Sequence, residues 1–159
     1  MTNIAGLIER LLAHEVEFVL IGGVAANLHG SARLTLDVDV VYRRSAENLR
    51  RIAEALGPLK PYLRGAPAGL PFQWDVETLK RALNLTLETS LGSIDLLGEV
   101  AGGGTWESLA PGSREIELGG RECRVVSLEQ LIALKRAAGR PKDLESIAEL
   151  ELIRDDSRA

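Results

Sequence analysis

The stretch FVLIGGVAANLHGSARLTLDVDVV, residues 18–41, decides the fold. A short apolar run ends at two adjacent glycines, Gly22 and Gly23, and a second apolar run contains Asp37 and Asp39. Neither the glycines nor the acids help these runs to pack, because glycine fills no core volume and a buried carboxylate costs free energy. The stretch therefore predicts two buried strands. The glycine pair between them and the aspartates within the second strand require an explanation other than core packing.

Alternating helix and strand patterns surround this stretch, judged from apolar spacing, caps and turn residues. Helices are expected over residues 3–14, 22–29, 45–56, 75–83, 127–138 and 141–152. Strands are expected over residues 17–21 and 36–42, with antiparallel hairpins over 84–97 and 114–126. Segment 57–74 contains four prolines and predicts an ordered loop or lid, and the charged tail after Leu152 is expected to fray.

This order of elements predicts an α/β (α+β) fold. We expect a mixed sheet of four to six strands, with helices packed mainly on one side and C-terminal helices closing a cleft. The 159 residues suit a single domain, residues 1–159, with a core over about 3–126 and C-terminal helices over about 127–153.

Composition and charge limit the classes of function. Apolar residues make up 45% of the chain and charged residues 26%, which is typical of a globular protein. The net charge of −4 argues against a surface built throughout to bind nucleic acid, but it leaves room for a local basic patch. The single cysteine, Cys123, cannot form an internal disulfide, and no apolar run is long enough to span a membrane. We therefore expect a cytoplasmic protein.

The glycine pair has two readings. Glycine is common where a strand turns tightly into a helix, because a side chain would clash there. Alternatively, two residues without Cβ allow a triphosphate to approach the backbone N–H groups that open the following helix. The glycines alone do not separate these readings.

The aspartates say more than the glycines. Asp37 and Asp39 share one face of a strand, and their mutual repulsion is tolerable on a solvated edge or beside a cation. The flanking valines favour a central strand, so buried carboxylates that bind metal are the stronger reading. Alternate carboxylates suit Mg²⁺, which keeps waters and nucleotide phosphates in its other positions. If its strand lies alongside, Asp95 supplies a third carboxylate, and three acids can hold two metal ions.

The glycine pair, thirteen intervening residues, Asp37-Val-Asp39 and the later Asp95 together resemble the nucleotidyltransferase superfamily of the DNA polymerase β type. The likeness covers roughly residues 18–97. It implies an enzyme in which Gly22 and Gly23 bind the nucleotide, while Asp37, Asp39 and Asp95 bind two Mg²⁺ ions, or Mn²⁺, and carry out catalysis. Gly23 departs from the many members that have serine at this position.

The C-terminal stretch SLEQLIALKRAAGRPKDLESIAEL, residues 127–150, resembles the end of small bacterial AbiEii-like or MNT-like nucleotidyltransferases. This resemblance adds Lys135 as a catalytic residue that contacts the phosphates, and Asp143 as a residue that orients Lys135 or the substrate. Similar proteins also have an arginine at the position of Arg33, which implies a contact with the nucleotide. Without the resemblance, Lys135 and its basic neighbours would read as a solvated helix end, and Arg33 as a surface residue.

The expected function is metal-dependent transfer of a nucleoside monophosphate (NMP) from a nucleoside triphosphate (NTP) to an acceptor hydroxyl, with release of pyrophosphate. The acceptor stays open among RNA, protein and small molecules, and a protein partner in a toxin–antitoxin pair is one expectation. Two alternatives remain: a non-catalytic module with the same fold that binds a nucleotide or a partner, and a phosphoesterase or nuclease that uses the same acids. The last is weakest because the chain has only two histidines.

Overall fold

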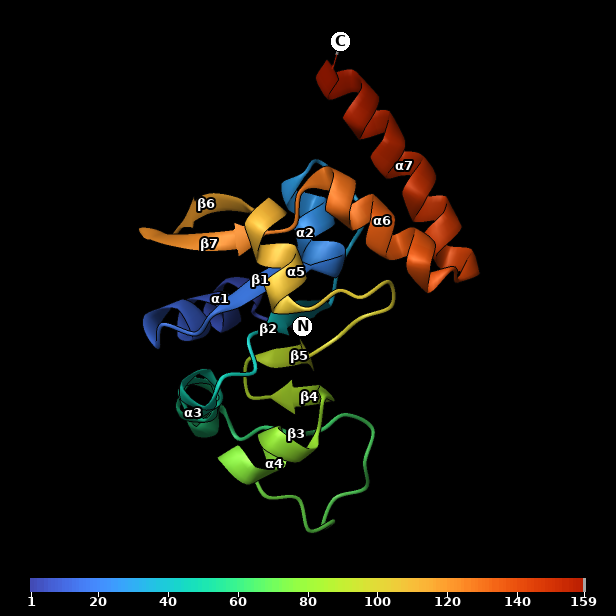
Figure 1. Ribbon diagram of the computed structural model, residues 1–159. Coiled ribbons are helices and arrows are strands. Elements are labelled where there is room, and N and C mark those ends of the chain that lie inside the picture. Colours follow the sequence, from blue (N-terminus) through green and yellow to red (C-terminus); the bar gives the residue numbers. More distant parts are fainter. Residues whose placement is uncertain (159) are drawn as a thin grey trace.

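A mixed β-sheet organises the chain (Figure 1). The computed structural model describes residues 1–158. Within them the sheet has seven strands in the order β3-β4-β5-β2-β1-β7-β6. Their bounds are β1 Phe18–Ile21, β2 Asp37–Tyr42, β3 Tyr62–Leu63, β4 Asn84–Thr89, β5 Gly92–Leu97, β6 Arg114–Leu118 and β7 Arg121–Val125. The predicted mixed sheet and both predicted hairpins are confirmed.

The six predicted helices are confirmed. The helices of the structure are α1 Ile4–Ala13, α2 Gly22–Leu28, α3 Ala46–Leu56, α4 Val76–Arg81, α5 Trp106–Leu109, α6 Leu128–Ala138 and α7 Pro141–Arg158. Helix α5, capped by Thr105, is an addition to the prediction. Ser45 caps α3, Asp75 caps α4, and Ser127 forms the expected capping box with Gln130. In the described part of the chain, no helix combines the length and the hydrophobicity needed to cross a bilayer.

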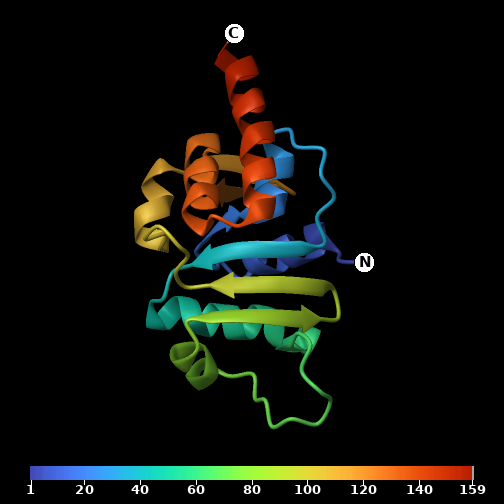
Figure 2. The ribbon, with the colours of Figure 1, turned by 90° about the vertical axis from the view of Figure 1, so that its right-hand side faces the viewer.

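The central strand β2 lies between β1, which runs antiparallel to it, and β5, which runs parallel. Helices α1 and α3 lie on one side of the sheet, and α6 with α7 lies on the other side, toward the β1 end (Figures 1 and 2). Val38, Val40 and Val41 are buried in the core, as expected for a central strand. Val38 and Val40 lie on one face of β2, and the alternate residues Asp37 and Asp39 point to the other face, which α6 and α7 only partly cover.

Strand β3 is a correction to the sequence prediction. The segment over residues 57–74, expected to be a loop or lid, forms a 3₁₀ turn over Gly57–Leu59 and then an edge strand. Tyr62 pairs with Glu88 and Leu63 with Leu87. A strand of two residues is too short to show an alternation of apolar and polar positions, and nearby prolines argue against a strand. The sequence pattern therefore did not predict this element. It raises the number of strands above the predicted four to six.

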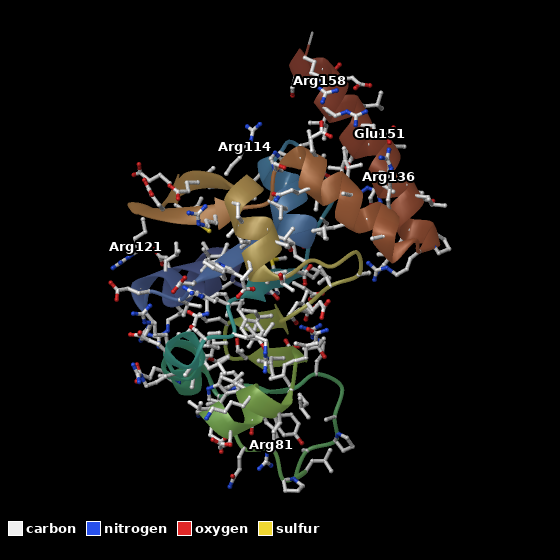
Figure 3. All side chains as sticks on the ribbon, in the orientation of Figure 1. Arg81, Arg114, Arg121, Arg136, Glu151 and Arg158 are labelled. Carbon is white, nitrogen blue, oxygen red and sulfur yellow. The ribbon has the colours of Figure 1, made fainter. Side chains whose placement is uncertain are left out.

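Helix α7 is longer than predicted. It continues through the charged tail to Arg158 instead of fraying after Leu152. Ion pairs across to α6 explain the extension: Arg136 contacts Glu151, and Arg158 Nη2 lies 2.6 Å from Glu129 Oε1 (Figure 3). Such pairs lie beyond the range over which a sequence pattern indicates a helix end.

Candidate active site

The three predicted acids meet on two neighbouring strands. Asp37 and Asp39 lie on β2, Asp95 lies on β5, and the register places Asp39 directly opposite Asp95. Directly opposed residues on paired strands share one face of the sheet. A cleft of about 400 Å³ opens at this point. Its walls include Gly22, Asp39, Asp95, Lys135, Arg140 and Asp143.

Crowding of the acids changes the protonation of Asp39. Its pKa is raised to about 7, first by burial, then by hydrogen bonding to the Asp95 carboxyl and by repulsion from Asp95 and Asp37. Arg64 acts in the opposite direction. A carboxylate that is protonated so readily is held in place by the fold at a cost in free energy, and a cation between the two acids would remove that cost.

This raised pKa predicts a pH dependence of stability. A folded-state pKa above the unfolded value of 3.8 means that the folded protein binds the extra proton between about pH 4 and pH 7. Without metal, the free energy of unfolding should therefore fall as pH rises through this window. In Asp39→Asn the contribution of Asp39 to this pH dependence should be absent. The free energy of unfolding of the variant at pH 8 should exceed that of wild type by on the order of 1–3 kcal/mol.

Urea unfolding at pH 5 and pH 8 in EDTA measures this difference, with wild type and variant compared at each pH so that other titrating groups cancel. Parallel pH profiles for the two proteins would show that Asp39 is ionised without strain.

The glycine pair makes room for side chains of the site. Gly22 has φ +66°, and a Cβ there would lie 2.0 Å from Asp39 Oδ2. A Cβ on Gly23 would lie 2.5 Å from Thr35 Oγ1. Gly22 is therefore required both by its left-handed backbone and by the carboxylate beside it. The packing reading of the pair is correct, and it applies directly at the predicted site.

Lys135 and Asp143 are brought together across the α6–α7 junction. Lys135 Nζ lies 3.9 Å from Asp143 Oδ1, and the Asp143 side chain is only 2% exposed. Arg140 donates to Asp143 from its backbone N–H at 3.1 Å and from Nε at 2.7 Å. These hydrogen bonds from Arg140, aided by the charges of Arg140 and Lys135, lower the pKa of Asp143. Asp143 is thus an ionised anchor that holds two cations at the cleft.

Burial lowers the pKa of Lys135, and Asp143 partly offsets that effect. The Lys135 side chain lines the same cleft as Asp143, Asp39 and Asp95, and the charge of Asp39 also raises its pKa. A largely covered lysine, 18% exposed, with a fixed carboxylate partner differs from the solvated helix end that composition alone would suggest. Its contact with nucleotide phosphates stays a prediction.

Arg33 shares a small cavity with Gly23 and Lys135 and does not line the cleft of the acids. It forms an ion pair with Glu149 on α7, with Nε 3.7 Å from Oε1, and its side chain is half exposed. The cavity that it lines has a volume of about 120 Å³. The structure shows no contact between Arg33 and the carboxylates, so a nucleotide-binding role for it stays a prediction.

Two arginines at the site were missed by sequence reasoning. The sequence analysis assigns Arg140 no role of its own, although the Arg-x-Lys-Asp run that contains Asp143 begins with it. Arg64 follows β3, and its Nη2 lies 2.7 Å from Asp95 Oδ1. The one available signal for Arg64 was electrostatic, because three converging acids require a nearby cation; the sequence did not say which one.

The carboxylates fit a hard cation by their chemistry, since all their donors are oxygens. Asp95 Oδ1 is buried and accepts no well-aligned hydrogen bond, even though Arg64 is near. Among residues 1–158, no three His, Cys, Asp or Glu side chains already surround one point as metal ligands. Asp39 and Asp95, with Asp37 one pleat away, are the residues that would hold such an ion.

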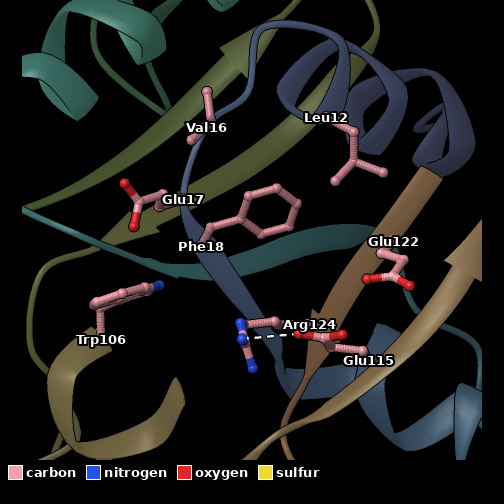
Figure 4. A pocket seen from close by; sticks show the side chains of 8 residues that line it. All are labelled: Leu12, Val16, Glu17, Phe18, Trp106, Glu115, Glu122 and Arg124. Carbon is pink, nitrogen blue, oxygen red and sulfur yellow. Dashed lines mark ion pairs between the residues drawn. The ribbon is translucent and has the colours of Figure 1, made fainter. Parts of the chain in front are cut away.

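A second cavity lies elsewhere on the molecule and shares no lining residue with the cleft. It is about 340 Å³ in volume and contains Phe18, Trp106 and the ion pair between Arg124 and Glu115 (Figure 4). Trp106 is thus remote from the acids, and Trp74 donates its indole N–H to Ala53 O. Neither tryptophan is placed to stack on a base at the cleft.

Comparisons with known proteins support the fold. No protein-family model matches the sequence, and no curated protein matches it. Two solved structures of the antibiotic-resistance factor ANT(2'')-Ia, an aminoglycoside nucleotidyltransferase, are similar in fold. The solution structure has a TM-score of 0.54 and 17% identity, covering 97% of this chain and 90% of that one. The crystal structure with adenylyl-2''-tobramycin has a TM-score of 0.55 and 17% identity, covering 98% and 94%.

The class of fold predicted from the motifs is therefore correct: this chain has the nucleotidyltransferase fold. At 17% identity the likeness concerns architecture alone. The narrower resemblance to AbiEii-like proteins is not confirmed by these structures.

Proposed function

We propose that this protein transfers a nucleoside monophosphate from an NTP to an acceptor hydroxyl and releases pyrophosphate. One observation carries the proposal: Asp39 and Asp95 lie directly opposite each other on adjacent parallel strands. In a nucleotidyltransferase fold, this pair lines a cleft whose walls also include Gly22 and Lys135. Paired carboxylates beside a lysine are the groups that phosphoryl chemistry uses.

The reaction needs one bond to form and one to break. The acceptor oxygen attacks the α-phosphorus of the NTP, and the bond from that phosphorus to the pyrophosphate oxygen breaks. Asp95 takes the proton of the acceptor hydroxyl, and Lys135 pairs with the phosphate charge. Mg²⁺ ions bound to Asp37, Asp39 and Asp95, or Mn²⁺ in their place, would neutralise charge on the phosphates. The protein contributes mostly alignment and electrostatic stabilisation.

The acceptor is the open part of the proposal. ANT(2'')-Ia was solved with adenylyl-2''-tobramycin, so ATP and an aminoglycoside form the first pair to test with this chain. RNA and protein acceptors follow from the resemblance to AbiEii-like proteins. A place in a toxin–antitoxin pair would favour these macromolecular acceptors over a small one.

A screen tests the proposal directly. Each of the four NTPs, labelled at the α-phosphate, is incubated with Mg²⁺ and the protein together with tobramycin, total cell RNA or cell protein. We expect label to transfer to at least one acceptor class, with release of pyrophosphate. Asp37→Ala is the control and should transfer nothing above background, because it removes a carboxylate of the proposed metal site.

The outcomes separate the candidate functions. Transfer by both proteins would place the chemistry elsewhere in the chain. Binding of an NTP by wild type, seen as a raised melting temperature, without transfer to any acceptor would favour the non-catalytic module. Release of phosphate or cleavage of RNA in place of transfer would favour the phosphoesterase or nuclease.

A further inference from the structure

Hydrogen bonds hold Arg64 at the acidic face of the sheet. It follows the edge strand β3, and its backbone N–H donates to Thr86 O at 3.0 Å. Its Nη2 also donates to Leu87 O at 3.0 Å, so the side chain reaches across β4 toward β5. Only 29% of the side chain is exposed. An arginine anchored by both backbone and side chain has a defined position against Asp95.

The guanidinium reaches the acids from the β3 edge of the sheet. Besides the 2.7 Å contact with Asp95 Oδ1, its Nε lies 3.5 Å from Glu88 Oε2. The register continues Asp95 to Asp39 along one row of the sheet. Arg64 therefore supplies the positive charge that Asp95 and the neighbouring acids require in the structure described here.

The contact is close, yet it leaves bonding capacity unused. Arg64 Nε and Asp95 Oδ1 are both buried without a hydrogen-bond partner. A well-formed arginine–carboxylate pair satisfies such atoms through two parallel hydrogen bonds. This pair is held together by charge more than by alignment, so a better cation can replace the guanidinium at Asp95.

We propose that Arg64 is a tethered cation that occupies Asp95 in the metal-free protein, and that a divalent ion must displace it to bind between Asp39 and Asp95. This inference rests on the proposed function, since it assumes the metal site. Mg²⁺ binds oxygen at about 2.0–2.1 Å, and a guanidinium at hydrogen-bond distance from the same oxygen would be crowded and repelled. Arg64 therefore sets the metal concentration at which the site fills.

Direct measurement of Mn²⁺ binding tests this role without any activity assay. Free Mn²⁺ is titrated by electron paramagnetic resonance in nucleotide-free wild type and in Arg64→Met. Because the variant lacks the competing charge, its Kd should be lower by on the order of tenfold. Arg64→Lys keeps a tethered charge and should stay within a few-fold of wild type.

Arg51→Met is the matched control. The Arg51 side chain is 28% exposed, nearly the same as that of Arg64, and it pairs with Glu47 at 2.9 Å on α3. Its removal should leave the Mn²⁺ affinity unchanged. If Arg64→Met does not fold, Arg64→Gln replaces it, because a glutamine amide is uncharged and can still donate a hydrogen bond.

Displacement itself has a spectroscopic readout. The Arg64 Nε–H resonance, assigned by its absence in Arg64→Met, should shift when Mg²⁺ saturates the wild-type protein. An unchanged resonance, or an Arg64→Met variant that binds Mn²⁺ no more tightly than wild type, would overturn the role of Arg64 and leave the proposed function standing. No Mn²⁺ binding by any nucleotide-free variant would also overturn the role of Arg64, whereas the proposed function is tested separately by label transfer in the presence of an NTP.

Discussion

Replacing Asp39 with alanine is expected to reduce Mg²⁺-dependent nucleotide transfer to background, a loss on the order of a thousandfold or more. Asp39 faces Asp95 directly across β2 and β5, so its loss removes half of the carboxylate pair that would hold the metal. The fold should survive, because the side chain is a source of repulsion and its pKa is already raised by its surroundings. Initial rates with the acceptor found in the screen give the measurement.

A second variant and a stability measurement make the Asp39 result specific. Asp39→Asn keeps the size and polarity of the side chain and removes only its charge, so it should be as inactive as Asp39→Ala. Thermal unfolding in EDTA at pH 8 should show both variants to be at least as stable as wild type. An Asp39→Ala protein that retains more than about a tenth of the wild-type rate would remove Asp39 from the chemistry.

The part of the site that lies on regular elements could be predicted from sequence. The alternation around Asp37 and Asp39 fixed which face of the strand they share, and valines on the other face placed the strand inside the sheet. The position of Asp95 beside Asp39 depends on which strands are neighbours in the sheet. Only the resemblance and the similar apolar pattern of the two strands suggested that they are. The observed register confirms this adjacency.

The part of the site that was not predicted from the sequence lies on irregular or edge elements. Arg64 follows a two-residue strand in a proline-containing segment, where neither periodicity nor turn chemistry indicates which side chain points inward. Arg140 lies between two helices, and its partner Asp143 lies in the first turn of α7. Arg64 is fixed by contacts with residues distant in sequence, whereas Arg140 pairs with Asp143 only three residues further on. Opposite charge was the clue to both.

Gly22→Ala should damage the site more than the stability of the fold. The added Cβ would lie 2.0 Å from Asp39 Oδ2 and 2.9 Å from Asp39 Cγ, so the carboxylate must rotate away from its place opposite Asp95. The left-handed backbone at φ +66° adds a cost of about 1–2 kcal/mol in stability. We expect transfer activity to fall by about a hundredfold or more, measured by initial rates beside urea unfolding.

Gly139→Ala is the matched control for the stability cost of placing alanine in a left-handed backbone conformation. Gly139 ends α6 with φ +65°, and an added Cβ there would meet nothing closer than Arg136 O at 3.7 Å. This variant should lose a similar 1–2 kcal/mol from the left-handed conformation and keep its activity. In an Asp39→Ala background, where the carboxylate is absent, the stability cost of Gly22→Ala should shrink toward that of Gly139→Ala. Equal costs of Gly22→Ala with and without Asp39 would show that the carboxylate does not press on Gly22, and that the glycine is required by its backbone alone.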